Sequence, residues 1–183
     1  MGWFGSIHES DNVFKLSNIK SVNGLSNISM TKVTDASYMF AGAYQLSLSE
    51  LPSNLSNVVN AYAMFSYAGV SDAIVSNAIG SATSVTNWGF AFSDCTGIST
   101  ANLNGLKADK VVNVSGMFVR VNSLESVSGL SGRTFSTVTT TASMFYGCSA
   151  LSSVDCGGLI SSSTMSISGM FAYTGITSMD VSG

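Results

Sequence analysis

The chain repeats a short sequence pattern at intervals of about 26 residues. Each copy centres on a Met-Phe pair or a close substitute, and successive phenylalanines are separated by 26, 25, 27, 26, 27 and 26 residues. The pairs are Val13-Phe14, Met39-Phe40, Met64-Phe65, Ala91-Phe92, Met117-Phe118, Met144-Phe145 and Met170-Phe171. A fixed period of this length is typical of stacked supersecondary units that bury their apolar sides against one another.

Composition excludes several classes of partner. Only 9% of the 183 residues are charged, although the usual share is about a quarter, and much of the polarity comes from 35 Ser, 14 Thr and 13 Asn. A net charge of −3 offers no basic surface for a phosphate backbone, so we expect no nucleic-acid partner. The chain has no run of about 18 apolar residues, so we expect no insertion into a membrane.

Each repeat predicts a short helix followed by a turn. Val111, Val114, Met117 and Phe118 recur at offsets of three to four residues, which would gather them on one side of a helix. A glycine or a small polar residue follows, as at Gly69 and Gly97. Next come aliphatic residues that we expect to be buried with the phenylalanines: Leu46, Val70, Ile98, Leu124, Leu151 and Ile176.

A short alternating segment then closes the repeat and predicts a strand, at 73–75, 101–103, 154–156 and 179–181. The predicted fold is therefore α/β, a stack of repeats with a parallel sheet on one face and short helices on the other. Residues 1–18 would form an N-terminal cap with a degenerate first repeat, and 19–183 would form the repeat array, together a single domain.

Three segments carry a resemblance to a known family: MFYGCSALSSVD, VTNWGFAFSDCTGISTANL and VVNVSGMFVRVNSLESV. They resemble the repeat of the BspA-like leucine-rich-repeat surface proteins, which has the core V-T-x-M-x-x-M-F-x-x-C-x-x-L, and the resemblance covers roughly residues 7–181. It implies a leucine-rich-repeat-like solenoid with a role in attachment or recognition. Relatives occur on bacterial and protist surfaces, in mycoplasma lipoproteins and in phage-encoded proteins.

The sequence favours no enzyme chemistry, cofactor or metal. His8 is the one histidine, and a serine nucleophile needs a positioned base. The acidic residues are dispersed rather than paired, and no glycine-rich phosphate loop is present. Cys95 and Cys148 occupy the same place two repeats apart, roughly 10 Å by strand spacing, so we expect buried thiols, not a disulfide.

The outward side of the predicted sheet is the candidate binding surface. Alternation turns one set of small polar and acidic residues away from the core, and such a row could bind a glycan or a protein surface. A merely solvated sheet face would show the same pattern. The candidates are Glu50, Asp72, Thr100, Asn102, Ser126, Ser128, Ser153, Asp155 and Asp180.

These observations predict a non-enzymatic recognition or attachment module. The chain shows no signal peptide, lipobox or wall anchor, which favours a virion component such as a tail fibre, with an extracellular or cell-surface protein as the other setting. Expected partners are a protein or glycan surface and further chains that contact the termini. The alternative is a purely structural subunit that packs into a larger assembly without binding a ligand.

Overall fold

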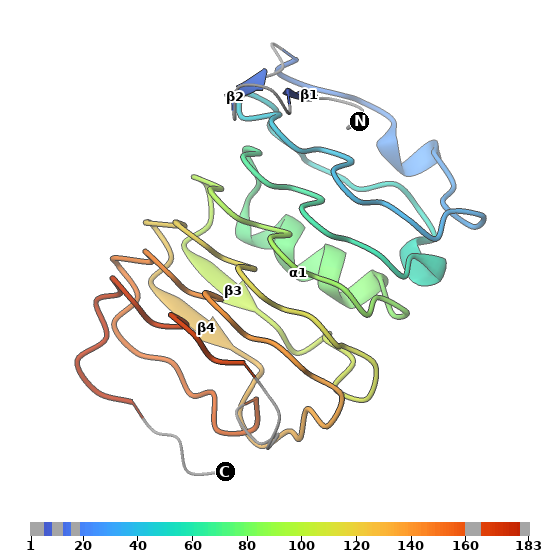
Figure 1. The fold of residues 1–183 in the computed structure, drawn as a ribbon. Coiled ribbons are helices and arrows are strands. Elements are labelled where there is room, and N and C mark those ends of the chain that lie inside the picture. Colours follow the sequence, from blue (N-terminus) through green and yellow to red (C-terminus); the bar gives the residue numbers. More distant parts are fainter. Residues whose placement is uncertain (1–5, 9–12, 16–18, 160–165, 180–183) are drawn as a thin grey trace.

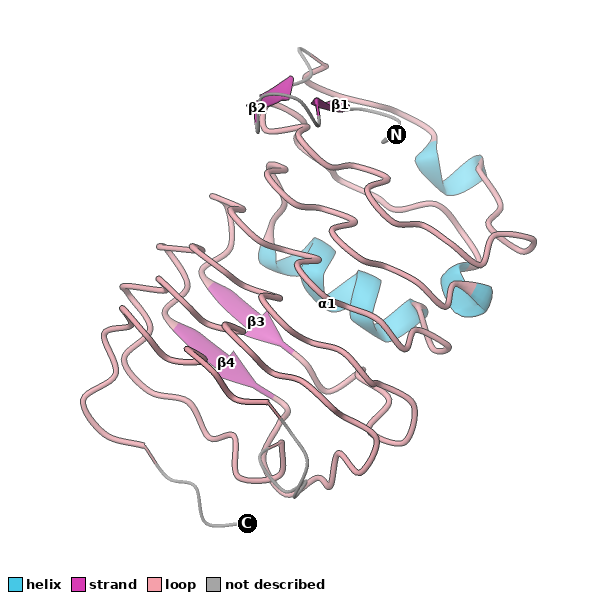
Figure 2. Ribbon diagram, in the orientation of Figure 1, coloured by secondary structure: helices cyan, strands magenta, loops and turns pink. Residues whose placement is uncertain are grey.

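A computed structural model of the protein describes residues 6–8, 13–15, 19–159 and 166–179, and of 6–8 and 13–15 it describes the backbone alone. The structure is mixed α/β, with few helices and short strands (Figure 2). Its elements are β1 (Ser6–His8), β2 (Val13–Lys15), the 3-10 helices η1 (Leu25–Asn27) and η2 (Leu55–Asn57), α1 (Asp72–Ser81), β3 (Thr100–Asn102) and β4 (Ser126–Ser128). The repeats lie side by side in chain order, as the run of colours in Figure 1 shows.

Neighbouring repeats pair in parallel, which confirms the predicted direction of pairing. β3 pairs with β4, with Thr100 opposite Ser126. Isolated parallel bridges join other repeats: Ser29 with Ser53, Asp35 with Asn60, Asn60 with Asn87, Asn87 with Asn113, Asn113 with Thr140 and Thr140 with Ser166. β1 and β2 pair antiparallel, with Ile7 opposite Phe14, so the first copy of the pattern is a strand and differs from the later copies.

The Met-Phe segments form series of turns, and the prediction of short helices there was wrong. Around Phe65, alternate N–H groups close turns within the repeat, as when Met64 N–H donates to the Ala61 carbonyl at 3.1 Å. The N–H groups between them donate to the next repeat, as when Phe65 N–H donates to the Ala91 carbonyl at 2.8 Å. A helix this short would be marginally stable on its own. The series of turns instead directs every second N–H group to the next repeat and so links the repeats.

One phenylalanine from each repeat enters a continuous stack that we call the phenylalanine spine. Neighbouring ring centroids lie 5.3–5.9 Å apart and the ring planes agree within 13°. The spine consists of Phe40, Phe65, Phe92, Phe118, Phe145 and Phe171, of which the last is half-buried and the others fully buried. The aliphatic residues predicted to accompany them are buried too, except Ile176, which is half-buried. The predicted core is therefore confirmed.

Residues 73–75 belong to α1, and the prediction of a strand there was wrong. Ser71 precedes the helix in extended conformation, and Asp72 lies in its first turn, where the helix dipole favours a carboxylate. The buried face has helical spacing that a three-residue window cannot reveal: Ile74, Val75, Ala78 and Ile79. The helix takes the place of the strand in its repeat and contacts β3 (Figure 1).

Two glycines after the spine let consecutive repeats approach closely. A Cβ on Gly97 would lie 2.6 Å from the carbonyl oxygen of Val70, and one on Gly69 would lie 2.9 Å from that of Leu46. Neither distance is compatible with a side chain, so a larger residue would push the repeats apart.

Candidate functional site

The strands of the predicted binding face show the expected alternation. On β3, Thr100 and Asn102 are exposed on either side of the buried Ala101. On β4, Ser126 and Ser128 are exposed on either side of the half-buried Val127. The alternation continues into the next repeat, where Ser153 and Asp155 are exposed and Val154 and Cys156 are buried.

Three of the predicted residues line one open pocket, which we call the sheet-face pocket. Its volume is about 490 Å³. The lining residues come from three consecutive repeats: Ser126, Val127, Ser153, Val154, Asp155, Ser178 and Met179. Serine hydroxyls can donate and accept hydrogen bonds, and a carboxylate accepts them, so this pocket offers both roles to a polar ligand.

Asp72 begins α1 rather than a strand, and its carboxylate contacts the outward-facing Thr100 of β3. Its carboxylate accepts four hydrogen bonds at 2.8–3.1 Å, from the N–H and hydroxyl groups of Ser99 and Thr100. Burial alone would raise the pKa of Asp72, but these hydrogen bonds outweigh it and lower the pKa. The carboxylate therefore joins the start of α1 to β3 and serves the fold.

The other predicted residues lie apart from the sheet-face pocket or outside the described chain. Glu50 is half-buried, and hydrogen bonding with Ser26 in η1 lowers its pKa. Asp180 and the side chain of His8 lie outside the described residues.

A second cluster combines charged and aromatic side chains and was not predicted. Tyr67, Asp94 and Arg120 each lie two residues after a spine phenylalanine, in three consecutive repeats. Arg120 Nε donates to Asp94 Oδ1 at 2.6 Å, and Arg120 Nη2 donates to Asp94 Oδ2 at 2.8 Å and to Tyr67 Oη at 3.2 Å. The bond with Asp94 raises the pKa of Arg120, so the guanidinium stays charged. We call these residues the Tyr-Asp-Arg triad.

The backbone at the triad is left-handed, with φ of 58° at Tyr67, 58° at Asp94 and 56° at Arg120. The outer repeats have Gly42 and Gly147 at this position, with φ of 76° and 75°. A residue with a side chain costs about 1–2 kcal/mol in this conformation. The three central repeats thus carry large side chains at a position where glycine would cost less, and Tyr173 of the last described repeat does the same, with φ of 59°.

Three aromatic rings from consecutive repeats lie beside the triad, and we call them the aromatic row. The ring centroids of Tyr38 and Tyr62 are 5.5 Å apart, and those of Tyr62 and Phe90 are 5.7 Å apart. A Cβ on Gly116 would lie 2.5 Å from the ring of Phe90, so the glycine leaves room for that ring. All three rings are half-buried and keep part of their surface accessible.

The aromatic row and the triad line a single pocket of about 270 Å³, which we call the aromatic pocket. Ser66 and Ser93 also line it, and their hydroxyl oxygens are 2.7 Å apart. Both serines are buried. The equivalent positions in the flanking repeats hold the apolar residues Ala41 and Val119. The sequence does carry a signal for this site: in the three central repeats, the residue two after the phenylalanine is Tyr, Asp or Arg.

A ladder of asparagines, also missed from the sequence, supports the turns before the spine. Asn60, Asn87 and Asn113 occupy one position in consecutive repeats, and the side-chain oxygen of each accepts the N–H two residues later at 2.8–3.1 Å. Asn113 Nδ2 donates to Asn87 Oδ1 at 3.0 Å, which links the repeats. These bonds use the amides for turn formation, so the ladder serves the fold.

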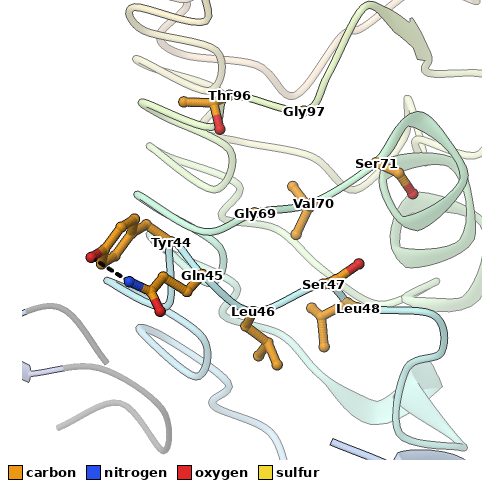
Figure 3. A pocket seen from close by; sticks show the side chains of 10 residues that line it. All are labelled: Tyr44, Gln45, Leu46, Ser47, Leu48, Gly69, Val70, Ser71, Thr96 and Gly97. Atoms are coloured by element: carbon orange, nitrogen blue, oxygen red, sulfur yellow. Dashed lines mark hydrogen bonds between the residues drawn. The ribbon is translucent and has the colours of Figure 1, made fainter. Parts of the chain in front are cut away.

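A third pocket, of about 350 Å³, lies between repeats near α1 (Figure 3). Its only side-chain hydrogen bond within the drawn set runs from Gln45 Nε2 to Tyr44 Oη at 2.7 Å. Gly69 and Gly97 form part of its wall, and no charged residue lines it. It offers fewer recognition groups than the other two pockets.

The three cysteines are buried and free. Burial raises the pKa of Cys95 and Cys148 to about 12 and that of Cys156 to about 11, so the thiols are poor nucleophiles. Across the described residues, no group of three or more His, Cys, Asp or Glu side chains is placed to hold a metal ion. Within the same ranges, no helix combines the length and apolar character needed to cross a bilayer.

The sequence matches the family described as Mycoplasma protein of unknown function, DUF285, over residues 6–78 and 86–182. The chain belongs to this family. The match agrees with the mycoplasma relatives that the sequence resemblance implies, and the family description assigns no function. No curated protein and no solved structure matches the chain.

Proposed function

We propose that this DUF285 protein is a non-enzymatic recognition or attachment module, built as a leucine-rich-repeat-like solenoid of the BspA type. Two observations support the solenoid: the parallel bridges between consecutive repeats and the continuous phenylalanine spine. In such arrays each repeat contacts mainly its neighbours, and one extended face remains available for binding.

The observation that carries the proposal is the sheet-face pocket. Ser126, Ser153 and Asp155 were selected as outward-facing from the sequence, and all three line the same open pocket. Val127 and Met179 add apolar surface beside these polar groups. Apolar surface with a few convergent polar groups is the usual composition of a binding site.

Binding assays on the pocket test this function. The native chain should bind saturably to a glycan array, to immobilised extracellular-matrix proteins or to whole cells. The combined variant Ser126→Ala, Ser153→Ala, Asp155→Asn should lose at least tenfold in affinity. Asp109→Asn, an exposed carboxylate outside the pocket, serves as the matched control and should bind as the native chain does. Equal binding by the triple variant would contradict the sheet-face pocket as the site.

The proposed setting is the outside of a cell or a virion, where an attachment module meets its target. Immunogold labelling of intact cells and of purified particles from the source organism tests this placement. Label confined to the cell interior would contradict it.

One observation favours the structural alternative, a subunit that packs into an assembly. In the last repeat, the N–H groups of Gly169, Phe171 and Tyr173 have no partner among the described residues. The equivalent groups of earlier repeats donate to the next repeat. Ile167 and Tyr173 are also 51% and 75% exposed. Concentration-dependent assembly in sedimentation, without any ligand binding, would favour this alternative.

A further inference from the structure

We propose that the aromatic pocket binds one neutral sugar ring, such as the terminal hexose of a glycan. This site is separate from the sheet-face pocket: the two share no lining residue. The inference therefore does not depend on the proposed function.

The aromatic row supplies the surface that a sugar ring requires. A pyranose has an apolar face of C–H groups, which packs against the face of an aromatic ring. The ring planes of Tyr62 and Phe90 form an angle of 60°, so the two rings are tilted and do not cover each other face to face. Gly116 gives the Phe90 ring room, because a Cβ there would lie 2.5 Å from the ring.

The triad and the buried serines supply partners for the sugar hydroxyls. A hydroxyl that enters a pocket needs both a donor and an acceptor, because burying it unpaired is costly. Asp94 offers carboxylate oxygens as acceptors, and Arg120, 52% exposed, offers N–H donors. In the Ser66–Ser93 pair one hydroxyl donates to the other, which leaves the hydrogen of the second for a ligand.

The charges favour a neutral ligand. Asp94 and Arg120 form a bidentate pair, so the pocket carries no net charge. A cation such as a quaternary ammonium would fit the aromatic rings but would find no uncompensated carboxylate, because Asp94 is already paired with Arg120. An anion would meet a guanidinium whose charge is already compensated by Asp94, which engages both Nε and Nη2.

The size of the pocket favours one ring over a longer ligand. Its volume of about 270 Å³ lies just below the range for small-molecule sites, which begins at roughly 300 Å³. A single small ring that makes few hydrogen bonds is expected to bind with a Kd on the order of 1 mM.

Ligand-observed NMR titration with methyl glycosides tests the proposal. The probes are the methyl glycosides of glucose, galactose, mannose and N-acetylglucosamine, and at least one should bind saturably to the full chain. Phe90→Ala and Asp94→Asn should each weaken that binding at least tenfold, whereas Phe90→Tyr should retain it. The matched control is Tyr173→Ala, because Tyr173 is exposed and lies outside the pocket. Thermal melting verifies that each variant is folded.

Three results would overturn the proposal. The first is no saturable binding of any of the four glycosides to the native chain. The second is unchanged binding by both Phe90→Ala and Asp94→Asn. The third is tighter binding of choline or inorganic phosphate than of any glycoside. The triple variant of the sheet-face pocket should bind the sugar as the native chain does. Loss of sugar binding in that variant would place the sugar in the sheet-face pocket instead.

Discussion

The inner side of the Met-Phe segment, which faces the core, keeps the same residue in every repeat, whereas the outer side varies. The inner side carries the same residue in six repeats, and its rings stack in parallel planes. Two residues later the outer side changes from repeat to repeat: Gly42, Tyr67, Asp94, Arg120, Gly147 and Tyr173. The backbone is left-handed at all six positions. The inner side therefore specifies the fold, and the outer side can differ without changing it.

Removing a spine ring tests the inner side and should have the largest effect. Phe118 is fully buried between Phe92 and Phe145, at centroid distances of 5.6 and 5.9 Å. Phe118→Ala should lower the free energy of unfolding by about 3–5 kcal/mol, because it leaves a cavity in the stack. Urea denaturation measures the loss. Tyr173→Ala, on the outer side, should change stability by less than about 0.5 kcal/mol. Similar losses for the two variants would refute the comparison.

Asp72 provides the next largest effect, since its carboxylate replaces the strand pairing that α1 interrupts. Asp72→Ala removes four hydrogen bonds to Ser99 and Thr100 and should cost about 2 kcal/mol in urea denaturation. Ser76→Ala, which loses one bond within α1, is the matched control and should lose less. Equal losses would mean that α1 is held by its own packing alone.

The lowered pKa of Asp72 also predicts how stability depends on pH. A carboxylate whose pKa is lower in the folded state stabilises the fold above its ordinary pKa of about 4. That contribution is lost as the pH falls through the lowered folded pKa. The native chain should therefore lose more stability between pH 7 and pH 3 than Asp72→Asn does. Asp35, whose hydrogen bonds with Ser37 lower its pKa, should keep some acid sensitivity in the variant.

The sequence correctly predicted which residues are buried, but it did not predict the turns and the helix, whose formation depends on hydrogen bonds. The 26-residue period and the buried phenylalanines follow from apolar spacing, and both are confirmed. The prediction of helices around the Met-Phe pairs was wrong, because a series of turns produces the same spacing of buried side chains. Residues 73–75 were read as a strand because three residues cannot separate helical from alternating burial.

The candidate sites show the same limit. Alternation along β3 and β4 identified Ser126, Ser153 and Asp155, because the strand period alone determines which side faces outward. The aromatic pocket could not be found this way. Most of its lining residues lie on left-handed backbone two residues before or after a spine phenylalanine, as at Phe90 and Asp94. Local spacing does not reveal that conformation.

The asparagine ladder supports the turns that precede the spine and should have an intermediate effect. Asn113 accepts the Ser115 N–H at 2.8 Å and donates to Asn87 at 3.0 Å. Asn113→Ala should cost about 1 kcal/mol, because it removes two hydrogen bonds from Ser115 and one bond between repeats. Asn122→Ala, at an exposed turn, is the control. Faster amide exchange at Ser115 in Asn113→Ala would place the loss in the turn, and unchanged exchange there would contradict the role of the ladder.

Exchanging residues on the outer side should have the smallest effect on stability. Asp94→Gly loses an ion pair with the half-exposed Arg120, worth at most about 1 kcal/mol, and relieves a left-handed aspartate, worth a similar amount. The two changes nearly cancel, so urea denaturation should show a difference below about 1 kcal/mol. At Gly147 the backbone is also left-handed and a Cβ would lie 3.2 Å from Arg120 Cγ, so Gly147→Ala should destabilise the chain by about 1–2 kcal/mol. If Asp94→Gly instead cost more than about 2 kcal/mol, the triad would be part of the fold, and the outer side would not be free to vary.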